Sequence, residues 1–509
     1  GQKEKKTVHH KKFADGGEVI VWETGRAGEE AASYENLFLR KEIAGFRTNI
    51  RREQSCSIKS LTRDYLYKQL LSSGEYTFDH MLVIKDPYGE APLTALALFI
   101  LEEPACVRVT TKGNLKETDF VTELPKKKEH RVPILGMYAE KANDIVIEIL
   151  DDEGNCVKSH TFTIRTKRLP KSLRNVITVK KWTDKPAYSN IMINGGVKIH
   201  TCVFDIEGEI RYYLSRKPRG YGIFPLSDGH FFYMEKYISV PSYSNPQTVE
   251  SYDMDYFGRV FRTYLTEKGV HHTAEEKAGG NILTGSNSML EHTEDCVIEI
   301  DRQTGEIVWQ LNMAEIFDET YQNMMDWCHV NSAAYYEKDR TILISLRNVH
   351  AVICVDYDTK KLRWILSDPK FWEGTKMTPY LLQPEGDVKW CYQQHAAFEI
   401  ALPDESNPQK KRIIVYDNHW AKRRKAKSFD KDPLSYVSFY DIDEEKKTVS
   451  LHKRFAGPKT RIRANGIYVP DKKRVYNMAG SYAEPVDGDG GGIFEYDYET
   501  GEVLSEFGV

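Results

Sequence analysis

The sequence predicts an all-β protein with a six-bladed β-propeller, preceded by a small β-sandwich domain and a short helical N-terminal arm. Three observations favour this fold. Aromatic residues make up 12% of the 509 residues, with 30 Tyr, and aromatic side chains pack well on pleated sheet surfaces. Short β-rich runs follow one another from residue 76 to 167. From about residue 180, a strand–turn–strand motif occurs six times, which is typical of propeller blades.

The N-terminal arm, residues 1–75, is charged. Its apolar residues Leu61, Tyr65, Leu66 and Leu70 fall on one face of a predicted helix, and we expect a second helix at about residues 29–45. The arm has too little apolar material to fold alone, so it must dock on another surface. This need for a surface favours a homodimer formed through the sandwich domain and the arm.

Residues 76–167 form the predicted sandwich, because several short strands at regular spacing are typical of such domains. One hairpin turn is expected at residues 151–155, where Gly154 can adopt a positive φ. A linker, residues 168–185, leads to the propeller at residues 186–509, and we expect the active site in its central channel.

Each copy of the propeller motif is a strand ending in Asp, a polar turn and a second strand. The six aspartates are Asp205, Asp255, Asp301, Asp356, Asp443 and Asp497. Each carboxylate can accept hydrogen bonds from the N–H groups of its turn. Four copies carry a Gly that suits a tight turn, whereas Lys360 and Lys447 stand near that place in the other two. We therefore expect those two turns to differ. The interval of 87 residues before Asp443 is interpreted as long loops and not as a seventh blade.

Polar residues mark the beginnings of the predicted innermost strands in successive blades. Arg347 and Asn418 end the strands that follow two of them, and the residues at the beginnings are His271, His272, His329, Asn331 and His395. Imidazoles, an amide and a guanidinium that converge on one point would bind an oxyanion such as sulfate or phosphate, and one imidazole could act as nucleophile or base.

Two other interpretations of this set remain open. The residues could simply be polar side chains that line a water-filled channel. For any single His, this interpretation and a catalytic role have roughly even odds. They could also bind zinc or copper, as His clusters do. Arg347 argues against a metal because it cannot act as a ligand and repels cations, and no carboxylate stands at these strand beginnings. We expect neither a metal nor a cofactor.

The motifs WCHVNSAAYYEKDRTILISLRN, ILSDPKFW, WCYQQHAAFEI and VYDNH resemble those of the bacterial arylsulfate sulfotransferases, which do not use the adenylylated sulfate donor. The resemblance runs from about residue 80 to the C-terminus. It implies a six-bladed propeller behind a small β-sandwich. It also implies transfer of a sulfuryl group from an aryl sulfate donor to a phenol acceptor by a ping-pong mechanism through a sulfohistidine.

The same resemblance implies a role for each matching residue. His395 corresponds to the nucleophile, and His329, Asn331 and Arg347 correspond to the groups that hold sulfate. One of His271 and His272 corresponds to an acid/base and anion-binding His. Which of these two neighbours faces the channel stays open, since alternate residues of a strand point to opposite faces.

The loop at residues 367–390 carries several large aromatic side chains, and we expect it to wall the ring of the phenol. An equal alternative is a loop that packs its own aromatics. The substrate-binding residues predicted here and nearby are Phe371, Trp372, Trp390, Tyr392, Asn331 and Asn418.

Composition limits the partners and the compartment. With 71 basic and 75 acidic residues the net charge is −4, so we expect no nucleic acid partner, which would require a concentrated positive field. The longest apolar run, residues 95–101, is far shorter than the roughly 20 residues of a membrane span, so we expect no membrane partner. The first residues are not a secretion signal, but the chain begins at Gly1 without Met, which leaves a removed signal open.

Secreted members of the family that the chain resembles carry a close Cys pair near the active site, whereas here only Cys391 is near the nucleophile. This favours a cytoplasmic location, with the periplasm or secretion as the alternative if a signal was removed. Two other functions remain open. A quinoprotein-like oxidoreductase would carry a quinone, and a non-catalytic propeller would bind a partner protein.

Overall fold

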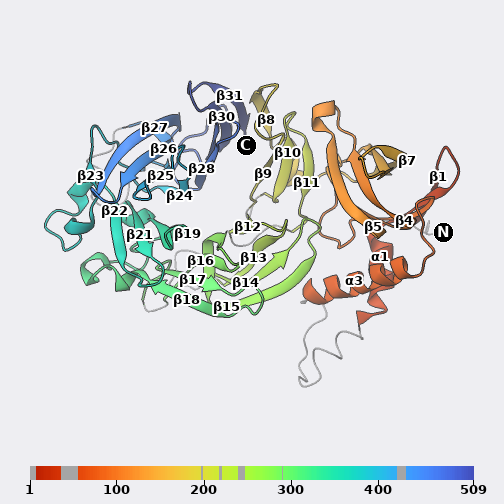
Figure 1. Ribbon diagram of the computed structural model, residues 1–509, viewed down its shortest axis with the longest axis horizontal. Helices are drawn as coiled ribbons and strands as arrows, with labels where there is room; N and C mark the ends of the chain where they lie inside the picture. Colours follow the sequence, from red (N-terminus) through yellow and green to blue (C-terminus); the bar gives the residue numbers. More distant parts are fainter. Residues whose placement is uncertain are drawn as a thin grey trace, which may run out of the picture.

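The computed structural model describes residues 7–35, 56–195, 199–216, 221–238, 247–288, 291–420 and 432–509. The chain is built mainly of strands. An N-terminal sheet domain lies beside a propeller-like ring of sheets (Figure 1). Within the described ranges, no helix combines the length and the apolar character that a bilayer crossing requires.

The N-terminal domain is a seven-stranded sheet in which β4 is the shared strand. The first residues of β4 pair with β3 and its last residues pair with β6, while β5 runs along β4 as a long hairpin partner. The turn between β6 and β7 has Gly154 at φ 85°, so the predicted hairpin is confirmed. The strands are β1 Val8–Lys12, β2 Glu18–Trp22, β3 His80–Lys85, β4 Ala95–Thr111, β5 Phe120–Ile134, β6 Ala142–Leu150 and β7 Cys156–Arg165.

The arm contains helices α1 (Thr24–Ala32) and α3 (Cys56–Ser72). The helix predicted around residues 61–70 is therefore confirmed. The other predicted helix begins earlier than expected, and residues 36–55 lie outside the described part of the chain. The arm is not only helical, because β1 and β2 belong to it and β2 pairs in parallel with β3. The short run EVIVW was missed as a strand.

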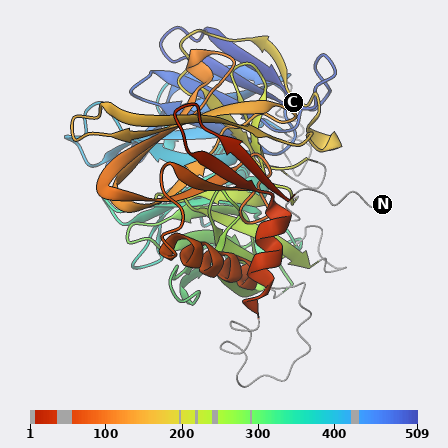
Figure 2. The same ribbon diagram turned by 90° about the vertical axis from the view of Figure 1, so that its right-hand side faces the viewer.

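The arm docks on its own chain. Leu66 and Tyr67 are buried with Phe257 of the propeller, and Ser60 Oγ accepts a hydrogen bond from the backbone N–H of Val260 at 2.9 Å. Figure 2 shows the two helices below the N-terminal sheet, alongside the propeller. The arm thus covers a surface without a second copy, and the homodimer stays a prediction.

The propeller-like region forms five hydrogen-bonded sheets among the described residues, four of which have four or more strands. Their order along the chain is also their order around the ring (Figure 1). The first three sheets are β9 Asn190–Ile193, β10 Cys202–Asp205 and β11 Ile210–Tyr213; then β12 Gly222–Pro225, β13 Phe231–Ile238, β14 Gln247–Met254, β15 Val260–Glu276, β16 Ile282–Ser286, β17 Cys296–Ile300 and β18 Ile307–Asn312; then β19 Val330–Tyr336, β20 Thr341–Leu346, β21 Ala351–Asp356 and β22 Leu362–Leu366.

The last two sheets have five strands each. They are β23 Gln383–Pro384, β24 His395–Ile400, β25 Lys410–Asp417, β26 Leu434–Asp443 and β27 Thr448–Pro458; then β28 Ala464–Val469, β29 Arg474–Ala479, β30 Gly492–Asp497, β31 Val503–Gly508 and β8 Thr178–Lys181. Short 3₁₀ helices cover Lys116–Thr118, Lys171–Leu173, Met313–Glu315, Glu319–Tyr321, Arg347–Val349, Pro369–Phe371 and Thr378–Tyr380.

The turn aspartates act as predicted. In all six copies the carboxylate accepts hydrogen bonds from backbone N–H groups of its turn. The prediction for the two copies with Lys was wrong, because Lys360 (φ 59°) and Lys447 (φ 53°) adopt the same left-handed conformation as the glycines. The turn geometry therefore prevails over the conformational preference of the side chain.

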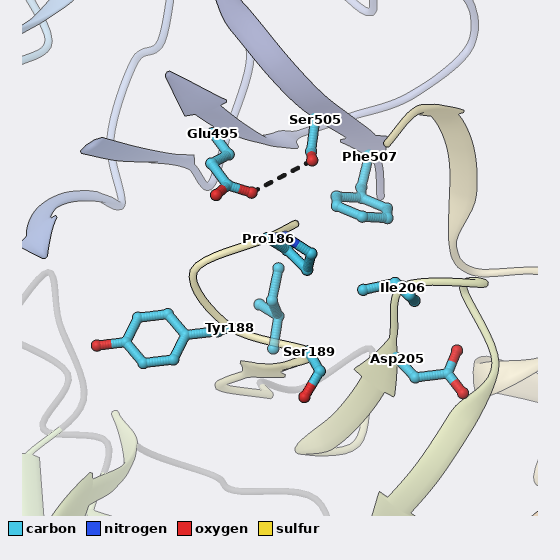
Figure 3. Close-up of a pocket in the computed structure, with 9 residues that line it drawn as sticks. Pro186, Tyr188, Ser189, Asp205, Ile206, Glu495, Ser505 and Phe507 are labelled. Atoms are coloured by element: carbon cyan, nitrogen blue, oxygen red, sulfur yellow. Dashed lines mark hydrogen bonds between the residues drawn. The ribbon is translucent and has the colours of Figure 1, made fainter. Parts of the chain in front are cut away.

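The ring is closed by strand β8, which comes before the first propeller sheet in sequence but pairs with β31 of the last. At this seam lies a small hollow between the last sheet and residues 186–191 and 205–206 (Figure 3). Glu495 joins the two sides, because its carboxylate accepts hydrogen bonds from Ser505 Oγ at 3.2 Å and from the backbone N–H of Ala187 at 2.9 Å.

One buried guanidinium joins the propeller to the N-terminal domain. Arg211 of β11 is 1% exposed and donates hydrogen bonds to the carbonyl oxygens of Gly136 (2.7 Å) and Thr118 (2.8 Å). It also forms an ion pair at 3.0 Å with Asp205, one of the turn aspartates. Removal of this side chain would leave two carbonyl groups and one oxygen of the buried Asp205 carboxylate without the donor that Arg211 provides.

We predict that Arg211→Leu lowers the free energy of unfolding by about 3–5 kcal/mol, the usual effect of breaking a buried ion pair. The exposed ion pair of Arg168 with Glu140 provides a matched control, since Arg168→Leu should cost less than about 1 kcal/mol. Urea denaturation of the two variants measures both effects. Equal transition midpoints would contradict a structural role for Arg211.

Candidate active site

The inner strands share a backbone irregularity where the predicted site residues lie. The ladder is broken between His271 and Ala274, between Val330 and Ser332, and between His395 and Ala397. Residues at or next to these breaks, and just before β28, adopt a left-handed conformation with φ between 54° and 58°: His272, His329, Ala396 and Arg463. Residues with side chains rarely adopt this conformation, and such strain is concentrated at functional sites.

His271 and His272 lie on the inner part of β15, and the break in the ladder brings both rings to the same region. Their Nδ1 atoms are 3.0 Å apart. His271 is fully buried, and its Nε2–H donates to the carbonyl of Ser286 at 2.8 Å. Its Nδ1 therefore accepts a hydrogen bond from His272 Nδ1–H, which leaves the lone pair of His272 on Nε2.

His272 is the member of this pair that reaches the other site residues. Its ring lies 4.6 Å from that of His329 and 4.4 Å from that of Tyr221, and its side chain keeps 15% exposure. Burial lowers the pKa of His272 well below its ordinary value; Glu294 opposes this shift, and the nearby His329 adds to it. His272 is thus a neutral imidazole.

His395 begins β24 and is held by a chain of hydrogen bonds. Asn418 Nδ2 donates to Thr460 Oγ1 at 2.9 Å, so its Oδ1 is the acceptor for His395 Nδ1–H at 2.8 Å. The lone pair of His395 is therefore on Nε2, where the backbone N–H of Arg463 approaches to 3.4 Å. Burial, with the charge of Arg347 as the next cause, lowers the pKa of His395 to about 3. His395 is a neutral imidazole with a fixed tautomer.

His329 has the opposite charge state. Its Nδ1 lies 2.6 Å from a carboxylate oxygen of Glu294 and 2.7 Å from one of Asp326. The two carboxylates overcome the effect of burial and raise the pKa of His329 to about 9. His329 is therefore an imidazolium at neutral pH, next to the neutral His272.

Glu294 and Asp326 were missed by the sequence analysis, which expected no carboxylate at these strand beginnings. Both belong to connections ahead of the strands and are nearly inaccessible, at 0% and 5% exposure. Asp326 could have been found three residues before His329 in DWCH. Glu294 comes from a different connection, and nothing in its sequence neighbourhood points to the site.

Arg347 follows β20 directly and is 5% exposed. Its Nη2 donates to Gln393 Oε1 at 3.2 Å, and its Nη1 donates to Asn348 Oδ1 at 3.3 Å. Asn331 donates from Nδ2 to the carbonyl of Gln394 at 2.8 Å, so part of its amide links β19 to the segment ahead of His395. Gln393 is a further residue that the sequence analysis missed.

The predicted aromatic residues separate into two groups. Phe371 stacks on His350 with ring centroids 5.0 Å apart and lies 5.9 Å from Tyr392. His350 Nδ1 in turn accepts a hydrogen bond from the backbone N–H of Gln393, the partner of Arg347. Phe371 and Tyr392 are thus connected to the site.

The two tryptophans lie elsewhere. Trp372 is 1% exposed and packs against Phe317 and Tyr321 in a core cluster. Trp390 is half-buried against a neighbouring cluster that includes Leu343. Within the described part of the chain, the ring contacts of Trp372 and the core packing of Trp390 involve none of His271, His272, His329 and His395.

The acidic residues raise the question of a metal. One ligand atom from each of His271, His272 and Glu294 lies within 4.8 Å of the others, and so do those of Glu294, Asp326 and His329. In the first set, the Nδ1 atoms of His271 and His272 are hydrogen-bonded to each other. In the second set, Nδ1 of His329 is protonated and donates a hydrogen bond to the carboxylate of Asp326. Hydrogen bonds and an ion pair therefore account for these contacts.

The sequence matches two family models. Residues 175–509 match the arylsulfotransferase model, and residues 82–167 match the immunoglobulin-like domain of arylsulfotransferases. The arylsulfate sulfotransferases AssT of Lelliottia amnigena and of Escherichia coli O6:H1 are 22% and 23% identical to the chain. In both comparisons the alignment covers 84% of this chain and 90% of the relative.

Among solved structures, the WD40 domain of Toxoplasma gondii coronin is similar at a TM-score of 0.33, with 9% identity over 81% of this chain and 75% of that one. The family model covers well over half of the chain, and it includes every predicted site residue. The chain therefore belongs to the arylsulfotransferase family, and it is a transferase that carries an immunoglobulin-like domain ahead of a propeller-like domain.

Proposed function

We propose that the enzyme transfers a sulfuryl group from an aryl sulfate to a phenol by a ping-pong mechanism, with His395 as the nucleophile. The observation that carries this proposal is the fixed tautomer of His395. Asn418 takes its Nδ1–H, so Nε2 has a lone pair at neutral pH, as a nucleophile requires. A buried, neutral imidazole needs no separate base.

The first half-reaction follows from the charges around this nitrogen. His395 Nε2 forms a bond to sulfur while the bond from sulfur to the phenolic oxygen breaks. Arg347 and the imidazolium of His329 provide positive charge for the sulfuryl oxygens and the departing oxygen, in a buried site where such charges act strongly. The products are a phenolate, which becomes a phenol on taking up a proton, and a sulfohistidine.

The second half-reaction reverses the first with a different phenol. The acceptor gives up its proton as its oxygen attacks sulfur, and His395 leaves as a neutral imidazole. Phenols suit this chemistry because their pKa, about 10, is low enough for proton transfer to an imidazole. Phe371 and Tyr392 are suited to contact the aromatic ring of both substrates. Contacts through His350 and Gln393 connect them to Arg347.

We also infer that the propeller has six blades. The seven-stranded sheet is continuous only because β15 is long: its residues 260–270 pair with β14, and its residues 271–276 pair with β16. If β15 belongs to two blades, the sheet accounts for blades two and three. The three-stranded sheet of β9–β11 is then the first blade. Between Asp356 and Asp443 the described residues add one sheet, which supports the absence of a seventh blade.

His395→Ala should lower the rate of 4-nitrophenol release from 4-nitrophenyl sulfate in the presence of phenol by at least about 10³-fold, because the nucleophile is lost. His452→Ala, at a partly exposed His on β27 that is hydrogen-bonded to Tyr498, is the matched control and should keep wild-type activity. With donor alone, intact-protein mass spectrometry should find one added SO₃ group on the wild type and none on His395→Ala. Phenol-dependent release that persists in His395→Ala would reject this nucleophile.

The tautomer argument predicts a change in pH dependence for Asn418→Asp. A carboxylate beside His395 Nδ1 raises the pKa of this imidazole from about 3 towards or above its ordinary value of about 6.5. Because the neutral imidazole attacks, activity is lost as the pH falls through the raised pKa. The wild type should lose no activity from this cause between about pH 8 and pH 5.

The pH–rate profiles of the wild type, Asn418→Asp and the exposed control Asn407→Asp check this prediction. Only Asn418→Asp should show the new loss of activity at acidic pH. A profile with the shape of the wild type in this variant would mean that Asn418 does not set the protonation state of the nucleophile.

Phe371→Ala should raise KM for the phenol acceptor by about tenfold, since an aromatic contact with the substrate ring contributes roughly 0.5–1.5 kcal/mol beyond buried area. The rate of the chemical step at saturation should change little. Tyr380→Ala, in the same loop at 37% exposure, is the control. Steady-state kinetics at varied phenol concentration measure KM for both variants. An unchanged KM for Phe371→Ala would show that Phe371 does not bind the acceptor.

A further inference from the structure

Glu294 and Asp326 are two charged residues in contact with His329 that the proposed mechanism has not yet used. They come from two different connections, one ahead of β17 and one ahead of β19, and meet at a single nitrogen of His329. Both carboxylates are almost completely buried. Buried carboxylates are costly unless a cation or several donors compensate them.

The backbone around the two acids is fixed by many contacts. The N–H of Val330 donates to the carbonyl of Glu294 at 2.8 Å, and Asn348 Nδ2 donates to the carbonyl of Asp326 at 2.7 Å. The N–H of Arg347 donates to the carbonyl of His329 at 3.1 Å. The carboxylates, the imidazole and the sulfate-binding guanidinium therefore belong to one rigid assembly, which is what precise placement of charge requires.

All charged and titratable groups near His329 have to be considered together. On the acidic side are Glu294 and Asp326, with the Tyr221 hydroxyl donating to Glu294 at 3.3 Å. The adjacent Asp295 is directed to Ser288. The imidazoles of His271, His272 and His395 are neutral in consequence of their lowered pKa values. Arg347 and Arg463 are the cations. Only the two carboxylates are in contact with Nδ1 of His329.

We propose that Glu294 and Asp326 are positioning residues that keep His329 as an imidazolium, so that its Nε2–H is the proton donor to the departing phenolate. This inference rests on the proposed function. In the first half-reaction the proton passes from His329 Nε2 to the phenolic oxygen as the S–O bond breaks and the N–S bond to His395 forms. In the second, the acceptor phenol returns a proton to the same nitrogen as its oxygen attacks sulfur.

The energetics favour this use of His329. An imidazole of ordinary pKa, about 6.5, would be mostly deprotonated at neutral pH and would have no proton for the leaving group. A pKa of about 9 brings the imidazolium close to the phenol value of about 10, and matched pKa values allow proton transfer in both directions. A ping-pong reaction that uses one phenol to leave and another to enter needs this reversibility.

The alternative acid is His272, which belongs to the pair matched by resemblance to an acid/base His. In the structure its Nδ1–H is already donated to His271, and its lowered pKa leaves it without a second proton. His272 can accept a hydrogen bond through Nε2 but cannot supply a proton at neutral pH. This difference separates the roles of the two imidazoles, whose rings are 4.6 Å apart.

The first test is the pH dependence of sulfuryl transfer from 4-nitrophenyl sulfate to phenol. The wild type should keep its kcat up to about pH 8 and lose it as the pH rises through about 9. Glu294→Gln and Asp326→Asn should each move this loss to lower pH by about one unit, and the double variant should move it towards about 6.5. At about pH 8 the double variant should then be roughly 30-fold slower than the wild type, but within about twofold of it at about pH 6.

The control is Glu291→Gln, an exposed Glu in the same connection as Glu294, which should keep the wild-type profile. A loss of kcat by the same ratio at every pH in Glu294→Gln would indicate a merely structural role and would overturn the proposal. An alkaline limit that stays in place in both single variants would overturn it as well.

The second test does not depend on activity. In protein labelled with ¹⁵N-histidine, with the His329 signals assigned through His329→Gln, the imidazole nitrogens should titrate near pH 9 in the wild type and at lower pH in Glu294→Gln. Titration at the ordinary pH in the wild type would refute the proposal. So would zinc bound at one equivalent that is lost in Glu294→Gln, because the carboxylates would then neutralise a metal. A raised midpoint in an enzyme that transfers no sulfuryl group would support the charge assignment and refute the proposed function.

Discussion

The site depends on a backbone constraint at the centre of the ring, where inner strands begin with a break in the ladder and a residue in the left-handed conformation. A regular strand would direct alternate side chains to opposite faces. The break allows neighbouring residues such as His271 and His272 to face the same region. It also frees main-chain groups to contact side chains of the site, as the N–H of Arg463 contacts His395. The hydrogen-bonded sheets around these residues hold them in the strained left-handed conformation.

A second principle of the site is that imidazoles of equal intrinsic pKa are given different charges: His329 is charged at neutral pH, whereas His272 and His395 are neutral. His395 is paired with an amide, His272 with another imidazole and His329 with two carboxylates. Each partner selects a tautomer or a charge, and burial favours the neutral form except at His329, where two carboxylates outweigh it. A neutral and a charged imidazole therefore coexist within one small volume at the same pH, as the proposed acid–base mechanism requires.

Features of the structure could be predicted where they depend on a local sequence pattern. The turn aspartates recur at recognisable spacing, and the polar strand beginnings, with the family motifs around His329 and His395, pointed to side chains that lie close together in the structure. Prediction failed where the information is not local. Glu294 reaches His329 only through the packing of two connections, and Lys360 and Lys447 adopt a conformation that the turn imposes against the preference of the residue. Strands β1 and β2 were hidden in a charged arm, because their partner β3 lies about 60 residues later in sequence.

The pairing of β8 with β31 has a consequence for the order of events during synthesis. The strand that completes the last sheet is made before the first propeller sheet, and its partner is among the last residues of the described chain. Until residues 503–508 leave the ribosome, β8 has no partner and the ring cannot close. Throughout that time the nascent propeller presents unpaired strand edges, which are prone to aggregation. The N-terminal domain, complete by residue 165 and joined to β11 through Arg211, is able to act as the folded platform on which the ring is assembled.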